Sequence, residues 1–514
     1  MERVERRVQR HVQLLIARGI RVACLVLATL SAPLGAAATG YTTYHFDNAR
    51  DGWNNDETRL NQTTVRSLQR IGDYALDGEV DAQPLYARGI AYVATENDTL
   101  YAIDPRRGVR WQRHFGTAVS DRYVGNCRAT APVIGISGTP VIDSSRNTLY
   151  LVAFTVSDGR AAYTLHAVNA ANGKEVRSVD ISPYVRDTRA HRQRAGLLLS
   201  HGSIYVAFGG FCDHQAATTY GRVLAFDATT LAPRGAFVTT ASPLCSGFHY
   251  GTIWGLGFAP AADSAGNVFL STGNGCIDYN RLPNGGYSDA VLRLTPDLRL
   301  RDTHASLFAP CTAVDDNRHD QEVGSAGVLL APDTQFAIAG GKNGVTYVLN
   351  RENLGGFRSH CPDRAVSEAE TSWGLWGGPA SWHSGNVTYV ALAGTGPDGL
   401  RVYALAETGE LKLRSETRER LFNGGQSAIV TSDPAATPRS LLLWTLTRPT
   451  TGTVYLRAYD ALDVRRRLLS VAAGSWGNPY GYAGNSPTVA DGYVFVATDK
   501  VLTVWTCRAQ RRKS

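Results

Sequence analysis

Residues 89–111 read GIAYVATENDTLYAIDPRRGVRW, and this stretch decides the expected fold. Its two apolar runs, at 90–94 and 99–104, are rich in Ile, Val, Leu and Tyr, and the polar pair Asn97-Asp98 lies between them. Such runs between turn signals are typical of short antiparallel strands. Gly108 favours a further turn after the second run. The stretch therefore predicts a strand, a turn and a second strand, after which the chain turns again.

The same unit recurs along the whole chain. Its first apolar run appears eight times, with central residues Tyr92, Tyr150, Tyr205, Phe269, Ala337, Tyr389, Leu443 and Val494. The intervals of 51 to 68 residues leave room for about four short strands in each copy.

A four-stranded unit of this size cannot bury both faces of its sheet alone, so the copies must stack on one another. Stacking in a ring gives a β-propeller, which leaves only short, protected sheet edges. Separate β-sandwich domains are the alternative, but no Pro/Ser-rich spacer lies between the copies. We predict an all-β chain with a single domain over residues 39–507, an eight-bladed β-propeller of four-stranded antiparallel blades.

The composition agrees with this fold and excludes several classes of function. Gly (52), Tyr (23) and Trp (9) are abundant and Met occurs once, as expected for a turn-rich, aromatic-rich β protein. The formal net charge of +7 arises at the two ends, in residues 1–21 and in a basic tail at 508–514. The near-neutral remainder has no basic stripe, which argues against a nucleic-acid partner. No stretch has the roughly 18–20 consecutive apolar residues of a membrane-spanning helix.

Residues 1–38 have the three parts of a secretory signal peptide. An Arg-rich segment is followed by an apolar run at 22–34 and by a Gly-Ala-Ala-Ala cleavage site. We expect cleavage near Ala38 and export to the periplasm or the extracellular space, with no membrane span in the mature chain. A lipoprotein cysteine at Cys24 and a twin-arginine signal at Arg6-Arg7 are weaker alternatives, because the residues around them do not fit those signals.

The cysteines after the signal peptide agree with an oxidising compartment. They are Cys127, Cys212, Cys245, Cys276, Cys311, Cys361 and Cys507. No CxxC or CxxCH motif is present, so neither a zinc knuckle nor a covalently attached haem is expected. We expect up to three disulfides and one remaining thiol. Our assignment pairs Cys212 with Cys245 and Cys276 with Cys311, although sequence alone leaves the connectivity open.

The repeat GxxYVAT…DTLYAID…G…W resembles that of the pyrroloquinoline-quinone (PQQ)-dependent dehydrogenases and their propeller relatives, over roughly residues 41–505. Non-catalytic relatives, including outer-membrane assembly factors, carry the same blade, so function depends on the central site. In that site an aromatic floor supports a flat quinone and cations contact its oxygens. An oxygen-ligated Ca²⁺ polarises the reactive carbonyl, and a carboxylate accepts the substrate proton.

Four residues acquire roles from this resemblance. Trp254, in the segment TIWG, corresponds to the family's floor, and Asn274, in STGNG, corresponds to a calcium ligand. Lys342, in GKNGVTYVLNR, falls where a basic residue contacts the quinone oxygens. Arg128 follows a single Cys, as in the membrane glucose dehydrogenases of the family.

Three departures from the family pattern stand beside these matches. The chain has no vicinal Cys-Cys pair. The calcium-binding Glu expected after an FGG motif is missing, and Asp213 is the only carboxylate nearby. Gly324 occupies the position of the catalytic Asp before an Ala-Gly pair, so Asp320 or Glu322 would have to serve as the base.

Each candidate also has a purely structural interpretation. Trp254 can be an aromatic residue that packs a blade, and Asn274, between two glycines, can be a turn residue. Lys342-Asn343-Gly344 has the sequence of a hairpin turn. The charged loop around Asp320 and Glu322 can simply be solvated.

Two functions follow, and the sequence leaves both open. The first is an exported quinoprotein-like oxidoreductase that uses PQQ and calcium to oxidise an alcohol or sugar. Asp320 or Glu322 would be its base, Asn274 and Asp213 its calcium ligands, and a separate acceptor would take the electrons because no haem motif is present. The second is a non-catalytic binding or scaffold module that engages an envelope protein or polymer. The hydrolase motifs G-x-S-x-G and H-E-x-x-H are absent, and no G-x-G-x-x-G follows a strand and opens a helix, which argues against NAD.

Overall fold

The structure is a computed structural model that describes residues 40–125, 132–211, 217–394, 396–420, 427–448, 452–477 and 486–507. The expected signal peptide (1–38), the basic tail (508–514), Arg128 and Asp213 lie outside the described residues. Within these residues, no helix is both long and apolar enough to span a lipid bilayer.

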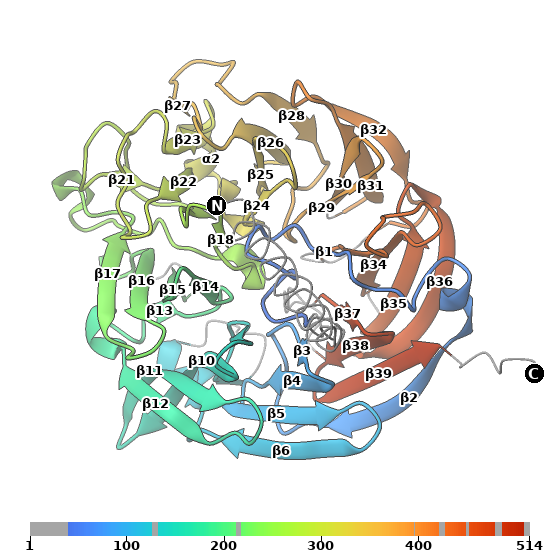
Figure 1. Ribbon diagram of the computed structural model, residues 1–514. Coiled ribbons are helices and arrows are strands. Elements are labelled where there is room, and N and C mark those ends of the chain that lie inside the picture. Colours follow the sequence, from blue (N-terminus) through green and yellow to red (C-terminus); the bar gives the residue numbers. More distant parts are fainter. Residues whose placement is uncertain are drawn as a thin grey trace, which may run out of the picture. The chain divides into compact units, whose positions relative to one another are not determined.

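The described residues form eight sheets of four or five strands, arranged in a ring around a common centre (Figure 1). Each sheet is built on four antiparallel strands, the first nearest the centre and the last at the rim. We call these sheets blades 1 to 8 in chain order. All eight repeat markers, from Tyr92 to Val494, lie on the second strand of a blade. The predicted all-β, eight-bladed propeller is therefore confirmed.

The strands of the first four blades are these. Blade 1 contains β3 (Leu85–Ala87), β4 (Ile90–Ala94), β5 (Thr99–Asp104) and β6 (Gly108–His114). Blade 2 contains β9 (Val141–Asp143), β10 (Thr148–Ser157), β11 (Arg160–Asn169) and β12 (Glu175–Asp180). Blade 3 contains β14 (Leu198–Ser200), β15 (Ser203–Gly210), β16 (Arg222–Asp227) and β17 (Pro233–Val238), with β13 (His191–Arg192) added to β15. Blade 4 contains β18 (Ala261–Ala262), β19 (Val268–Ser271), β22 (Val291–Leu294) and β23 (Leu307–Ala309), with β27 (Gly356–Phe357) parallel to β23.

The other four blades follow in the same order. Blade 5 contains β24 (Val328–Leu330), β25 (Phe336–Gly340), β26 (Val345–Asn350) and β28 (Ser367–Glu370). Blade 6 contains β29 (Ala380–Ser384), β30 (Val387–Ala393), β31 (Leu400–Leu405) and β32 (Leu411–Glu416). Blade 7 contains β33 (Ile429–Thr431), β34 (Leu442–Thr447), β35 (Thr453–Asp460) and β36 (Asp463–Ser475), with β1 (Trp53–Asn54) parallel to β33. Blade 8 contains β37 (Thr488–Ala490), β38 (Tyr493–Thr498), β39 (Val501–Cys507) and β2 (Leu68–Ala75).

The remaining elements lie in the loops. Two small hairpins pair β7 (Val119–Ser120) with β8 (Val133–Ile134) and β20 (Ile277–Asp278) with β21 (Gly286–Tyr287). The helices are α2 (Ala313–Arg318) and the 3₁₀ turns η1 (Thr64–Ser67), η2 (Asp121–Val124), η3 (Ser182–Tyr184), η4 (Pro243–Cys245), η5 (Gly255–Gly257) and η6 (Val323–Ser325).

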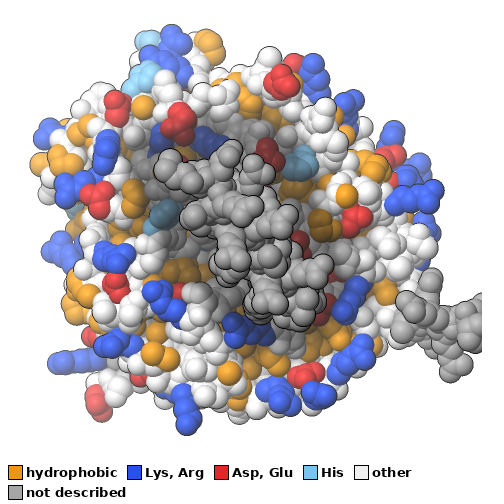
Figure 2. All heavy atoms as spheres, in the orientation of Figure 1, with side chains coloured by type: hydrophobic (Ala, Val, Ile, Leu, Met, Phe, Trp, Pro, Cys, Tyr) orange, Lys and Arg blue, Asp and Glu red, His pale blue; other side chains and the backbone are white. Residues whose placement is uncertain are grey.

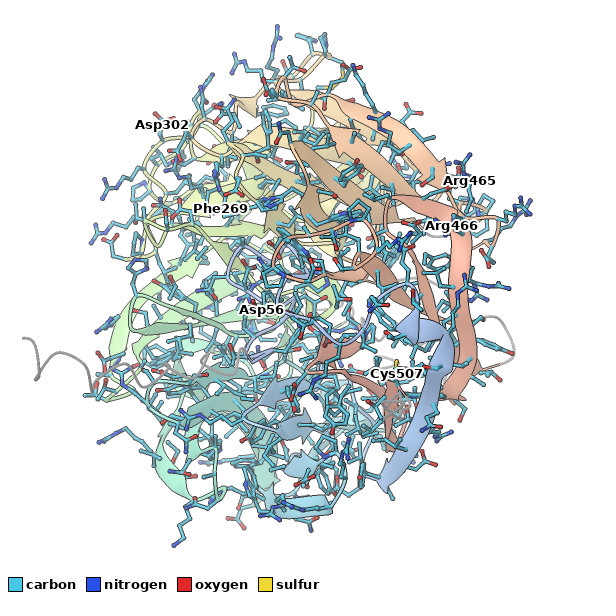
Figure 3. The ribbon with its side chains drawn as sticks, turned by 45° about the vertical axis from the view of Figure 1, so that its right-hand side comes forward. Asp56, Phe269, Asp302, Arg465, Arg466 and Cys507 are labelled. Carbon is cyan, nitrogen blue, oxygen red and sulfur yellow. A yellow bond between two sulfur atoms is a disulfide. The ribbon has the colours of Figure 1, made fainter. Side chains whose placement is uncertain are left out.

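The ring is closed by β2, which supplies the outermost strand of blade 8. β2 pairs antiparallel with β39, from Leu68 opposite Cys507 to Ala75 opposite Val501, and Figure 1 shows the blue strand beside the red one at the rim. Blade 8 therefore joins the two ends of the described chain. Cys507, at the end of β39 (Figure 3), is the cysteine of the described part that forms no disulfide.

Residues 41–54, which we call the strap, cross the inner strands of all eight blades from inside the ring. The strap backbone carbonyls accept hydrogen bonds of 2.7–2.9 Å from the inner strands of blades 1, 2, 4, 5, 6 and 7, donated by Tyr86, Ile142, Ala262, Leu330, Ser381 and Val430. The side-chain amides of Asn48 and Asn54 donate to Leu199 O of blade 3 and Val489 O of blade 8, each at 2.8 Å. The strap is therefore hydrogen-bonded to every blade.

The side chains of the strap fill the interior of the ring. Arg50 is fully buried and donates to five oxygen atoms, namely Pro260 O (2.9 Å), Thr43 Oγ1 (2.7 Å), Tyr44 O (2.9 Å), Asp47 O (2.9 Å) and Leu197 O (3.4 Å). The rings of Tyr44 and His45 stack on each other, and both meet Phe258 edge-on. Burial lowers the pKa of His45 to about 3, so its imidazole is neutral. Packed side chains therefore fill the ring where the strap crosses it.

The hydrophobic core lies between neighbouring blades. One cluster joins Tyr92 and Leu100 of blade 1 to Leu149 of blade 2 and Phe495 of blade 8, all buried. Each blade thus buries its faces against the next, as stacking of the repeats predicts.

Trp444 on β34 gives a direct test of this core. It is fully buried between blades 7 and 8, and its Nε1 donates to Thr431 Oγ1 at 2.9 Å. We expect Trp444→Ala to lower the free energy of unfolding by about 3–5 kcal/mol, because the vacated volume cannot be refilled. Urea denaturation followed by circular dichroism measures this. Trp373→Ala, at a site 64% exposed, is the control; a Trp444 effect as small as this control's would contradict the packing described.

Charged side chains of both signs lie around the rim of the face shown in Figure 2. Surface side chains of the chain form ion pairs such as Arg59 with Asp491 at 3.0 Å and Arg465 with Asp463 at 2.7 Å. Arg465 and Arg466 project from the outer strand β36 (Figure 3). Exposed pairs of this kind contribute at most about 1 kcal/mol each. The rim charges are therefore a minor source of stability.

Candidate functional site

Four of the predicted site residues lie in loops at one end of blades 4 and 5. Asn274 follows β19, Lys342 follows β25, and Asp320 and Glu322 precede η6, which leads into β24. The strap reaches β24 at its other end, where Leu330 N donates to Ala49 O. In blade 5, the strap therefore contacts the end of the inner strand that is farther from the candidate site.

Four of the predicted residues form one connected cluster. Lys342 Nζ lies 2.7 Å from Asp320 Oδ1 and 3.1 Å from Glu322 Oε1. Asn274 Nδ2 donates to the same Asp320 oxygen at 2.6 Å. The backbone supports the cluster, because Lys342 N donates to Glu322 O at 3.0 Å. Residues from three separate loops therefore meet at one point. We call these four side chains the Lys342 cluster.

Exposure changes steeply across the Lys342 cluster. The side chains are 1% exposed at Glu322, 17% at Lys342 and 68% at Asp320. Burial raises the pKa of Glu322 to about 7, against the opposing effect of Lys342. Burial acts to lower the pKa of Lys342, but the ion pairs with Glu322 and Asp320 outweigh it and raise that pKa. At neutral pH the Lys342 ammonium is charged and the buried Glu322 carboxyl can gain or lose a proton. The exposures show that the charged loop is solvated at Asp320 but not at Glu322.

Two oxygen atoms of the cluster, Asn274 Oδ1 and Glu322 Oε2, are buried and have no hydrogen-bond partner among the described residues. Amide and carboxylate oxygens are the ligands that Ca²⁺ prefers, in shells of six to eight. The described residues contain no group of three or more His, Cys, Asp or Glu side chains that could hold a metal. Asn274 Oδ1 would therefore be one ligand of a calcium ion whose other oxygens come from a cofactor and water, while Glu322 Oε2 is free to accept a proton.

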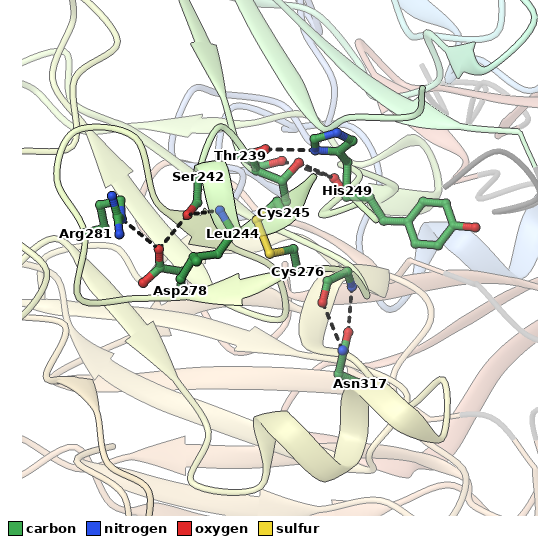
Figure 4. The surroundings of a disulfide bond; sticks show 12 residues. Thr239, Ser242, Leu244, Cys245, His249, Cys276, Asp278, Arg281 and Asn317 are labelled. Atoms are coloured by element: carbon green, nitrogen blue, oxygen red, sulfur yellow. Dashed lines mark hydrogen bonds and ion pairs between the residues drawn. A yellow bond between two sulfur atoms is a disulfide. The ribbon is translucent and has the colours of Figure 1, made fainter. Parts of the chain in front are cut away.

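The loop that carries Asn274 is held from both sides. Asn317 on α2 accepts from Gly275 N at 2.6 Å and donates to Gly275 O at 2.9 Å (Figure 4). Cys276, which follows Gly275, forms a disulfide with Cys245 at the end of the turn η4 (Figure 4). Asn274 O itself accepts from Gly251 N at 2.6 Å. Asn274 is therefore placed by the fold before any ligand binds.

The disulfides correct our expectation from the sequence. The pairs are Cys245–Cys276 and Cys311–Cys361, with Cα atoms 5.5 and 5.2 Å apart. The expected pairs Cys212–Cys245 and Cys276–Cys311 are therefore wrong. Cys311 and Cys361 follow β23 and β27, and these strands pair in parallel within the sheet of blade 4, which brings the two distant cysteines together.

Trp254 lies beside the loop that carries Asn274. A Cβ atom at position 273 would lie 2.9 Å from Trp254 Cδ1, so the glycine there lets the indole pack against the loop. The indole is partly exposed. This position of Trp254 suits both an aromatic floor under a cofactor and the packing of a blade. The floor role of Trp254 stays a prediction. The Lys342-Asn343-Gly344 segment does form the turn between β25 and β26, as its sequence favours, while the lysine side chain joins the cluster.

Two further residues support the cluster, although no sequence motif pointed to them. Trp376 places its ring 5.3 Å from Lys342 Nζ. Asp289 is buried, and its Oδ1 accepts from Val323 N at 2.8 Å, beside Glu322. Burial raises the pKa of Asp289 well above its ordinary value. The Trp-rich run at 372–376 was the visible signal for Trp376, whereas Asp289 resembles an ordinary turn residue.

A second buried charged cluster lies in blades 1 to 3, at the same end of the propeller. Arg192 Nη2 lies 3.2 Å from Asp81 Oδ2 and 3.6 Å from Glu96 Oε1. Burial and the neighbouring Asp81 raise the pKa of Glu96 to about 8. Burial, assisted by Arg192, lowers the pKa of Arg194 to about 10. Glu96 follows β4 as Asn274 follows β19, so equivalent loops of different blades carry the two clusters.

No protein-family model and no curated protein matches the chain. Solved structures do share its fold. Quinohemoprotein alcohol dehydrogenase ADHIIG from Pseudomonas putida HK5 is 13% identical over 93% of this chain and 81% of its own, with a TM-score of 0.64. A europium-containing methanol dehydrogenase is 13% identical over 91% of this chain and 98% of its own, with a TM-score of 0.60. BamB from Moraxella catarrhalis is 13% identical over 87% and 99% of the two chains, with a TM-score of 0.50.

At these identities the likeness concerns the fold alone. The resemblance drawn from the repeat is confirmed at that level, because the chain has the propeller fold that quinoprotein dehydrogenases and BamB share.

Proposed function

We propose that this chain is an exported, quinoprotein-like oxidoreductase that binds PQQ and calcium and oxidises an alcohol or a sugar. The Lys342 cluster is the observation that carries this proposal, because a buried carboxyl with a pKa of about 7 is paired there with a charged lysine. Perturbed groups of this kind are typical of acid–base sites. The two disulfides agree with export, since such bonds persist in oxidising compartments.

Each residue of the site has a proposed role. PQQ, when bound, supplies a carbonyl group that accepts two electrons from the substrate. Glu322 would accept the proton of the substrate hydroxyl, since its Oε2 has no hydrogen-bond partner among the described residues. Lys342 would donate to a quinone oxygen, and Asn274 Oδ1 would bind calcium. Trp254 would offer the face of its indole.

Asp320 is the weaker candidate for the base. It is exposed and already accepts hydrogen bonds from Asn274 and Lys342, so it holds these two side chains in place. Arg128, as a further cofactor contact, and Asp213, as a calcium ligand, stay predictions. A separate acceptor would take the electrons.

Calorimetric titration of the mature chain with PQQ, with and without Ca²⁺, tests this function. We expect saturable, calcium-dependent binding that Trp254→Ala and Lys342→Ala each weaken at least about tenfold, a loss of about 1.4 kcal/mol. Lys412→Ala is the matched control, because Lys412, on the outer strand β32, is 60% exposed and pairs with the equally exposed Glu410. It should bind PQQ as the unchanged protein does.

The absence of binding at high micromolar PQQ would refute the quinoprotein function. The alternative is a non-catalytic module that engages an envelope protein or polymer, since BamB has the same fold. Equal weakening by Lys412→Ala would show that the effect is not specific to the site.

A further inference from the structure

The Lys342 side chain is enclosed on several sides although it begins in a hairpin turn at the surface. Asp320 and Glu322 contact its ammonium group at 2.7 and 3.1 Å. The indole of Trp376 lies near it, with the ring centre 5.3 Å from Nζ. A long, flexible lysine in such a turn would ordinarily extend into water, because holding it costs side-chain entropy.

Trp376 is itself fixed by the backbone. Leu375 N donates to Gly341 O at 2.8 Å, and this bond docks the 371–376 segment on the turn that carries Lys342. Gly374 has φ +89°, and a Cβ atom there would lie 2.8 Å from both Gly341 O and Lys342 Cα. The close approach of the two segments therefore requires glycine at position 374, and it determines where the Trp376 side chain lies.

We infer that Trp376 is a positioning residue for Lys342, and that its π face holds the ammonium against Glu322 and away from water. The ring attracts the cation electrostatically, and this attraction grows when the cation is partly desolvated. The buried Glu322 draws the ammonium inward and the exposed Asp320 draws it outward, so the ring face of Trp376 adds to the attraction of Glu322. The inference concerns the placement of a side chain and does not rest on the proposed cofactor.

Lysine labelling tests this inference without any activity assay. The chain has five lysines, at 174, 342, 412, 500 and 513, so reductive methylation followed by peptide mass spectrometry resolves each one. We expect slow labelling of Lys342 in the unchanged protein. Trp376→Ala should accelerate it about five- to thirty-fold, the factor that corresponds to losing one cation–π contact.

Matched variants distinguish a cation–π effect of Trp376 from steric shielding of Lys342 by an apolar side chain. Trp376→Phe keeps an aromatic face and should restore slow labelling, whereas Trp376→Leu keeps apolar bulk and should label as fast as Trp376→Ala. Trp373→Ala removes the neighbouring indole, which is 64% exposed, and should leave Lys342 unchanged. Lys412 labelling and the circular dichroism spectrum report on folding in every variant.

Three results would overturn the inference. The first is unchanged labelling of Lys342 in Trp376→Ala. The second is slow labelling in Trp376→Leu, which would mean that bulk alone shields the lysine. The third is acceleration by Trp373→Ala equal to that of Trp376→Ala, which would assign the shielding to the segment as a whole.

Discussion

Replacing Arg50 by Ala is expected to lower the free energy of unfolding by about 4 kcal/mol or more. Its fully buried guanidinium donates to five oxygen atoms, in the strap and in the segments that enter blades 3 and 4. Truncation leaves these acceptors buried without a donor, and each such loss costs about 1–3 kcal/mol. Urea denaturation at neutral pH measures the change.

Arg59→Ala is the matched control for this prediction. Arg59 is 63% exposed and pairs with Asp491 at the surface, so its loss should cost less than about 1 kcal/mol. Arg50→Lys should fall between the two, because one ammonium cannot reach all five acceptors. If Arg50→Ala and Arg59→Ala were equally mild, the strap would not stabilise the ring.

Glu322→Gln is expected to stabilise the protein by an amount that grows with pH. Burial raises the folded-state pKa of Glu322 from 4.5 to about 7. The folded chain therefore keeps a proton that the unfolded chain releases, so the unchanged protein loses stability as the pH rises from about 4.5 to about 7. Gln has no such proton. The difference between the two proteins should grow by about 3 kcal/mol across this window and then level off.

Urea denaturation at half-unit pH intervals from 4 to 9 measures this difference. Glu410→Gln, at an exposed carboxylate paired with Lys412, is the control and should show no comparable trend. A difference that is constant with pH, or that falls as the pH rises, would contradict the burial of the Glu322 carboxyl.

The propeller repeat could be predicted from the sequence because each copy is marked by a short-range pattern of residue types. Each marker, such as Tyr92 or Val494, lies in a short apolar run bounded by turn residues, and this pattern persists whatever the neighbouring blade is. The strap has no such pattern. Residues 41–54 contain buried polar side chains such as Arg50 and Asn54, and their partners lie in eight segments spread over the chain. Only the assembled ring shows why those residues are polar.

The candidate site was predictable in part for a similar reason. Asn274 and Lys342 sit in short motifs of their own blades, so they could be selected one blade at a time, and the fold does bring them together. The contact of Trp376 with Lys342 depends instead on a glycine-mediated approach between two blades. The disulfide pairs were not readable from the sequence, because Cys311 and Cys361 become neighbours only through the parallel pairing of β23 with β27.

The strap also constrains the order of folding. Its residues are among the first of the described chain to be synthesised, yet the hydrogen bond from Asn54 to Val489 spans 435 residues. That bond cannot form until the last blade exists, and closure by β2 against β39 has the same requirement. Contacts so distant in sequence make folding slow, because the entropy of a long loop is lost before they form. A nascent chain truncated before blade 8 therefore lacks the contacts that close the ring. We expect the ring to gain its full stability only in a final, cooperative step after synthesis is complete.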